Sequence, residues 1–114
     1  MNEEERPPLL REVYPDLVEE LAGLLLAEGE AALAAGVREL RLVAPCTCGD
    51  GSCRSFRTAA HAPGTPYGPG HRCVPLLPER GLLTLDVVDE RVVYVEVLHR
   101  PELRDARPPA APAP

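Results

Sequence analysis

The four cysteines of this 114-residue chain all lie between positions 46 and 73, and this clustering constrains the fold more than any other feature. Three occur in the segment Cys46-Thr47-Cys48-Gly49-Asp50-Gly51-Ser52-Cys53, and the fourth, Cys73, comes two residues after His71. Thiolates that bind one metal ion must converge around it at about 2.3 Å, so the chain between them has to turn back on itself.

Zinc is the metal that this cluster favours. The N-terminus lacks the basic start and apolar run of a secretory signal, and no apolar stretch is long enough to span a bilayer. We therefore expect a cytoplasmic protein whose thiols stay reduced, and in that compartment grouped cysteines are more typical of metal sites than of disulfides.

The spacing C-x-C-x4-C-x19-C predicts a closed, structural zinc site. Cys46, Cys48 and Cys53 supply three ligands, and Cys73 is favoured as the fourth. His71 is the alternative to Cys73, since the two are too close in sequence to act independently, and His61 is a weaker substitute. Because a structural site contributes folding energy, we expect chelation to unfold the domain.

Other interpretations of the cysteines remain open. They could form a disulfide or a redox-active dithiol, although the usual C-x-x-C redox spacing is absent. They could also be unligated buried thiols, or hold an iron–sulfur cluster or copper.

Enzymatic activity is the less favoured class of function. A catalytic zinc keeps an open position, and neither H-E-x-x-H nor H-x-E with a following P-C-x-x-C occurs here. The chain has no lysine, which excludes lysine nucleophiles, Schiff bases and the P-loop lysine. We assign no catalytic residue.

The loop Tyr67-Gly68-Pro69-Gly70-His71-Arg72 places an aromatic ring, an imidazole and a guanidinium on a turn-rich backbone. Tyr67, His71 and Arg72 could bind a ligand there, and an open metal site near His71 and Arg72 would make the chain a small metalloenzyme or a metal-dependent binding protein. Alternatively, this segment is a connection that its glycines and prolines shape. Asp86 and the other acidic residues of the C-terminal region fit a solvated sheet face.

Residues 15–35 have the apolar periodicity of a helix that begins at Pro15 and is weakened near Gly29. The period changes to two over residues 37–44, which predicts a strand, and residues 53–59 could return beside it. Residues 60–81 predict an irregular loop, because they are rich in proline and glycine. Residues 82–88 and 91–98, separated by Asp89-Glu90, predict the clearest hairpin.

These elements predict an α+β fold in which one N-terminal helix packs on a four-stranded antiparallel sheet of two hairpins. We expect a disordered N-terminal arm over residues 1–8, a single zinc-binding domain over residues 9–104, and a disordered Pro/Ala tail over residues 105–114. A sheet covered on one side leaves a face for a protein partner or a second copy. The net charge of −6 argues against nucleic acid as that partner, and we expect no membrane contact.

The segments CTCGDGSCRSF and GLLTLDVVDERVVYVEVLHRPEL resemble those of small uncharacterised bacterial proteins that carry C-x-C-G-D-x-x-C before a final hairpin. The resemblance spans residues 15 to 104, marks Cys46, Cys48 and Cys53 as a unit, and implies no activity. The sequence as a whole favours a small zinc-binding module for interaction or regulation. A metalloenzyme or ligand-binding protein and a cytosolic thiol protein are the alternatives.

Overall fold

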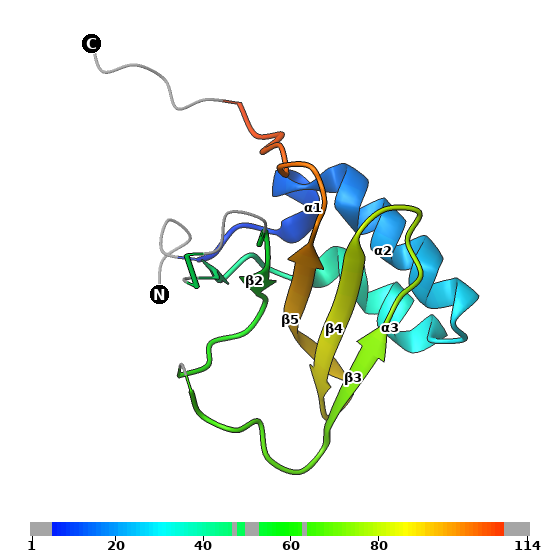
Figure 1. Ribbon diagram of the computed structural model, residues 1–114, viewed down its shortest axis with the longest axis vertical. Helices are drawn as coiled ribbons and strands as arrows, with labels where there is room; N and C mark the ends of the chain where they lie inside the picture. Colours follow the sequence, from blue (N-terminus) through cyan, green and yellow to red (C-terminus); the bar gives the residue numbers. More distant parts are fainter. Residues whose placement is uncertain (1–5, 47, 50–52, 63, 109–114) are drawn as a thin grey trace.

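Helices and strands form two layers in the part of the chain that the computed structural model describes, residues 6–46, 48–49, 53–62 and 64–108. Within these ranges the helices cover one face of a five-stranded antiparallel sheet, and no helix covers the other face (Figure 1). The helical segments are α1 (Leu10–Val13), α2 (Pro15–Ala27), α3 (Ala31–Gly36) and a 3-10 turn (Val37–Glu39), and the strands are β1 (Ala44–Pro45), β2 (Phe56–Arg57), β3 (His71–Pro75), β4 (Leu82–Val88) and β5 (Arg91–Leu98). The predicted α+β class is confirmed, with three helices rather than one and five strands rather than four among the described residues.

The strands lie in the order β1-β2-β5-β4-β3, so the C-terminal hairpin occupies the middle of the sheet. β1 and β2 extend it on one side through two-residue ladders, and β3 extends it on the other side through five paired residues. Residues that follow β1 and residues on β3 therefore belong to opposite edges of the sheet.

The predicted C-terminal hairpin is confirmed with its predicted bounds. Asp89 and Glu90 have φ angles of 50° and 65°, the left-handed conformation that a two-residue type I′ turn requires. The ladder shifts register between Asp86 and Val87, and this bulge places Tyr94 opposite Asp86.

The predicted helix is also confirmed, and it is interrupted where the sequence is weakest. Pro15 occupies the first turn of α2, and Gly29, with a φ of 78°, lies between α2 and α3. The short helix α1, which precedes Pro15, was not predicted. Its four residues are too few to give a helical period.

The predicted strand at residues 37–44 is wrong over most of its length. Residues 37–39 form the 3-10 turn, and residues 40–42 pair with the N-terminal segment through Leu10 N–H to Leu40 O (2.8 Å) and Leu42 N–H to Pro8 O (2.9 Å). The two-residue period is that of an extended segment, but its partner is residues 8–10. Only Ala44, at its end, enters the sheet.

The prediction of an irregular loop over residues 60–81 is wrong for residues 71–75, which form β3. The first part of that segment, up to residue 70, has no regular structure among its described residues. Pro75 ends β3 at the edge of the sheet, where a residue without an N–H is tolerated.

The predicted disordered arm and tail lie only partly within the described residues. Pro8 accepts the hydrogen bond from Leu42, and Ala106 donates one to Val13 O (2.8 Å), so the inner end of each segment contacts the domain. Residues 1–5 and 109–114 lie outside the described ranges, as do most residues of the predicted turn at 49–52.

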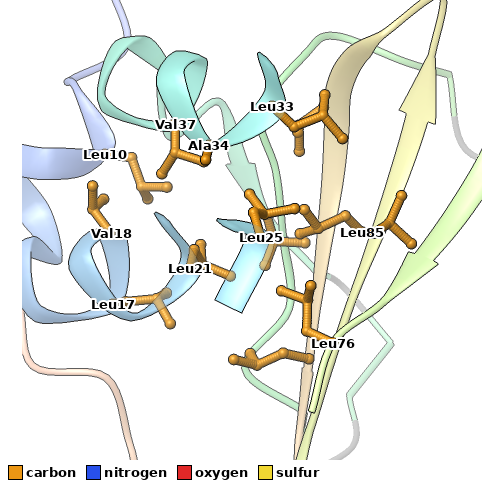
Figure 2. Packing of buried hydrophobic residues seen from close by; sticks show 14 of the residues in the cluster. Leu10, Leu17, Val18, Leu21, Leu25, Leu33, Ala34, Val37, Leu76 and Leu85 are labelled. Carbon is orange, nitrogen blue, oxygen red and sulfur yellow. The ribbon is translucent and has the colours of Figure 1, made fainter. Parts of the chain in front are cut away.

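The hydrophobic core fills the space between the helices and the hairpin (Figure 2). Leu21 and Leu25 of α2 point from the helix layer toward the sheet, and Leu85 of β4 meets them from the other side. Along β4 the buried side chains alternate with partly exposed ones, which turns Thr84, Asp86 and Val88 toward the face that no described helix covers. We call this the open face of the sheet.

No helix within the described residues is long and apolar enough to cross a membrane.

Candidate metal centre

Three thiols gather where the chain passes from β1 to β2. The potential ligand atoms of Cys46, Cys48 and Cys53 all lie within 4.8 Å of one another, and we call these residues the three-cysteine group. Cys46 and Cys53 are half-buried, whereas Cys48 is exposed. The group could therefore bind a metal ion.

Backbone pairing beyond the short strands fixes two of these cysteines. Cys46 N–H donates to Ser55 O (2.9 Å), which continues the β1–β2 ladder by one residue. Cys53 lies opposite Leu98 of β5, and the following Arg54 N–H donates to Val97 O (2.8 Å). Both cysteines are thus attached to the sheet.

Hydrogen bonds stabilise the thiolate form of Cys46. The side chain of Tyr94 is the main cause, and contacts with Cys48 and Cys53 add to it, so that the pKa of Cys46 falls from 9.0 to about 7 despite partial burial. Burial raises the pKa of Tyr94, and its hydrogen bond with Cys46 raises it further. At neutral pH the Cys46 thiol is therefore partly ionised. The thiolate is the form that binds metals.

Cys73 and His71 do not join the three-cysteine group. They lie on β3, at the other edge of the sheet, where they form a second group with Asp86 of β4. The sequence placed Cys73 close to the other cysteines by assuming that a flexible loop carried it. Because residues 71–75 are a strand paired with β4, its position is fixed by that pairing.

In the second group, Asp86 is the shared acceptor. Its Oδ1 lies 2.8 Å from His71 Nε2 and 3.2 Å from Cys73 Sγ, and the sulfur lies 4.0 Å from the imidazole nitrogen. The hydrogen bond to Asp86, followed by desolvation and the negative charge of the carboxylate, raises the pKa of the Cys73 thiol.

Tyr94 lies between the two groups. Cys73 pairs with Asp86, Asp86 with Tyr94, and Tyr94 with Arg57, so these four residues form one row across four strands. Paired residues of an antiparallel sheet share a face, so the row lies on the open face. Sequence reasoning did not identify Tyr94 or the role of Asp86, because both depend on the bulge and on the pairing of β3.

The predicted ligand-binding set of Tyr67, His71 and Arg72 is only partly brought together. The Tyr67 ring lies 4.6 Å from that of His71 and 4.5 Å from that of His61, and Arg57 approaches the Tyr67 hydroxyl at 3.4 Å. His61 itself contacts Thr65 O at 2.6 Å and belongs to neither cysteine group.

Arg72 points to the helix side of the sheet, away from Tyr67 and His71. It forms two-pronged ion pairs with Glu30, which precedes α3, and with Glu90 of the hairpin turn, at 2.8–3.0 Å. These contacts link the helix layer to the hairpin. The guanidinium of Arg72, which the sequence predicted to bind a ligand, is occupied by these ion pairs instead.

Comparison with protein-family models, with curated proteins and with solved structures finds nothing that matches this chain. The resemblance to small bacterial proteins with a C-x-C-G-D-x-x-C segment therefore stays a prediction.

Proposed function

We propose that this chain is a small zinc-binding module in which Cys46, Cys48 and Cys53 hold the ion. The convergence of three sulfur atoms within 4.8 Å carries the proposal. Zinc fits this donor set because thiolates dominate the ligands of structural zinc sites. The hydrogen bond between Tyr94 and Cys46 also supports zinc binding. It lowers the pKa of Cys46, so that fewer protons have to be released from this thiol when metal binds near pH 7.

The ion would stabilise one edge of the sheet. β1 and β2 contribute two paired residues each, and a ladder of that length is marginal by itself. A zinc ion held by Cys46 and Cys53 would join the end of β1 to the start of the β2 ladder. The role we infer is structural, and no described residue needs to act as an acid or base for it.

We infer that the module acts by binding a protein partner or a second copy of itself through the open face. No described helix covers that face, and it carries the three-cysteine group together with partly exposed side chains such as Tyr94. Leu82, at the start of β4, is 49% exposed beside it. Exposed apolar groups gathered on one face are typical of surfaces that bind other proteins.

Metal analysis of the full chain tests the zinc site. Protein purified under reducing conditions without chelators is expected to contain zinc, and Cys53→Ser is expected to contain less of it, because the variant lacks one thiolate of the three-cysteine group. Ser52, the neighbouring residue, offers the matched control Ser52→Ala, which removes no thiol. Wild-type protein that contains no zinc and does not take it up would overturn the proposal.

A second candidate function is thiol–disulfide exchange, and the low pKa of Cys46 beside two further thiols favours it. The Cys46 thiolate would attack a disulfide of a partner and release one partner thiol. Cys48 or Cys53 would then displace the second partner thiol, leaving the partner reduced and this chain oxidised. Metal-free protein that does not reduce a mixed disulfide faster than glutathione of equal concentration would exclude this function.

A further inference from the structure

The second group, His71, Cys73 and Asp86, contains an imidazole, a thiol and a carboxylate in contact on the open face. These are the three kinds of side chain that bind zinc. We propose that this group is a separate divalent-metal site, so that the chain holds two ions at opposite edges of its sheet.

The distances between the donor atoms suit a tetrahedral ion. Ligands bound to zinc at 2.0–2.3 Å in tetrahedral geometry lie about 3.3–3.8 Å from one another. The three separations here are 2.8, 3.2 and 4.0 Å, which bracket that range. An ion would widen the contact between Asp86 and His71 by roughly half an ångström and shorten the one between His71 and Cys73, which side-chain rotation can supply.

The site is built on paired strands, which position ligands more firmly than loops do. Cys73 and Asp86 lie directly opposite each other in the β3–β4 ladder, and His71 is two residues before Cys73 on the same face. The ring of Tyr67 lies against that of His71, with the centroids 4.6 Å apart and the planes tilted by 33°, and restricts the orientation of the imidazole. Two of the three ligands therefore have their relative position set by the backbone.

Metal binding would replace two hydrogen bonds. In the structure Asp86 accepts hydrogen bonds from His71 Nε2 and from the Cys73 thiol. An ion would bind Cys73 as thiolate, with the thiol proton released to solvent, and would bind Nε2 of neutral His71, whose one ring proton would then be on Nδ1. Asp86 would keep its position and become the third ligand.

The second site differs chemically from the three-cysteine group. It offers one sulfur, one nitrogen and one oxygen donor, and its side chains are partly exposed, with 30% of His71 and 22% of Asp86 accessible. Three protein ligands leave a fourth position for water or for a donor from a bound molecule here, as they do at the three-cysteine group. The two sites share the open face and have separate ligands, so each can be removed without the other.

Titration of the reduced, metal-free full chain with Co²⁺ tests this proposal, because absorption by cobalt reports both stoichiometry and sulfur ligation. Wild-type protein is expected to bind two equivalents. Cys73→Ser and Asp86→Asn are each expected to weaken one equivalent by more than about tenfold, the loss that even outer-shell partners of a metal cause. Both variants should keep the stronger sulfur-to-cobalt absorption of the three-cysteine group.

Cys53→Ser provides the reciprocal test, since it is expected to weaken that strong absorption and keep the second equivalent. His99→Asn is the matched control, because it removes a histidine outside both groups and suits the positive φ of 56° at that position. Circular dichroism would confirm that each variant is folded, and Asp86→Asn is nearly isosteric with the wild type.

A single equivalent that Cys53→Ser abolishes and Asp86→Asn leaves unchanged would overturn the second site and leave the proposed zinc module intact. A single equivalent that both Cys53→Ser and Cys73→Ser abolish would show one shared site, and would also overturn the proposal. Loss of cobalt from Cys73→Ser alone, with Cys53→Ser unaffected, would support the second site and contradict the three-cysteine one.

Discussion

The side chain of Tyr94, in the middle of the sheet, forms a hydrogen bond with the thiol of Cys46, just beyond the end of β1. This contact is the largest cause of the fall in the Cys46 pKa to about 7. A residue of a central strand thus lowers the pKa of a cysteine that follows a strand of only two residues. The contact links the best-formed part of the fold to the proposed metal centre.

We expect Tyr94→Phe to raise the pKa of Cys46 from about 7 toward its ordinary value of 9.0, because the substitution removes the hydroxyl and keeps the ring. The thiolate is the form that reacts with iodoacetamide. Pulsed alkylation of the metal-free protein at a series of pH values, with mass spectrometry of the Cys46 peptide, measures the midpoint.

The matched control is Tyr67→Phe, which removes a hydroxyl that contacts Arg57 and not Cys46. Its alkylation midpoint is expected to equal that of the wild type. A wild-type midpoint near 9, or one that Tyr94→Phe does not move, would contradict the role of Tyr94.

The same substitution is expected to change how stability depends on pH. The folded-state pKa of Cys46 lies below its ordinary value, so its ionisation stabilises the metal-free fold fully above pH 9 and ceases to do so as the pH falls through 7. The difference in unfolding free energy between wild type and Tyr94→Phe should therefore grow from pH 6 to pH 9. For a half-exposed thiol we expect a growth on the order of 1 kcal/mol. Urea denaturation at several pH values measures it, and a difference that shrinks with rising pH would exclude this coupling.

The sequence predicted the parts of the fold that depend on local patterns. The hairpin at 82–98 combines alternating valines and leucines with a two-residue connection, and the helix from Pro15 has a clear apolar stripe. Its interruption at Gly29 also follows from local propensity. The grouping of Cys46, Cys48 and Cys53 was predictable for the same reason, since one short connection contains all three.

The remainder depends on pairing between distant segments, which a single sequence does not encode locally. Residues 40–42 have the period of a sheet strand, yet they pair with residues 8–10. β3 lies in a segment whose prolines and glycines predict a loop, and its ladder with β4 places Cys73 beside Asp86. The bulge at Asp86 then sets Tyr94 in the same row. One predicted four-ligand site became two groups because of these non-local contacts.

Removal of the proposed zinc ion is expected to loosen one edge of the sheet without unfolding the domain. Apart from Phe56 of β2, the buried core belongs to the helices, the C-terminal hairpin and the segment 74–76, none of which contains a residue of the three-cysteine group. With a chelator, hydrogen exchange should accelerate at the amides of Cys46 and Arg54, which hold this edge. The amides of β4 and β5 should remain protected.

Exchange measured by mass spectrometry with and without chelator distinguishes local from global unfolding. The control is Cys53→Ser, which should already show the faster exchange and should not respond further to chelation at residues 44–57. Equal loss of protection in β4 would contradict a local role and would support the expectation from the sequence that the metal holds the whole domain together.

Two adjacent leucines of α2 test the position of the core. Leu25 is fully buried against the sheet (Figure 2), whereas Leu26 is 60% exposed. We expect Leu25→Ala to lower the free energy of unfolding by about 2–5 kcal/mol, because it leaves a cavity. Leu26→Ala is expected to change it by less than about 0.5 kcal/mol. Chemical denaturation of both variants measures the two free energies of unfolding. Similar losses for the two would contradict the orientation of α2, in which Leu25 faces the core and Leu26 faces solvent.

Two glycines are expected to respond in opposite directions to replacement by alanine. Gly23 lies inside α2, and a Cβ atom built there has no neighbour within 4 Å. Gly23→Ala should therefore raise the free energy of unfolding by about 0.5–1 kcal/mol, because it restricts the unfolded chain and favours helix.

Gly81, just before β4, has a φ of 67°, and a Cβ there would lie 2.5 Å from Leu98 O and 2.7 Å from His99 O. Leu98 ends β5 and His99 follows it, and both atoms are backbone, so the clash cannot be relieved by side-chain rotation. Gly81→Ala should cost more than about 1 kcal/mol and lower the thermal midpoint, since left-handed strain adds to the clash. Stabilisation by Gly81→Ala would show that the turn before β4 differs from the one described.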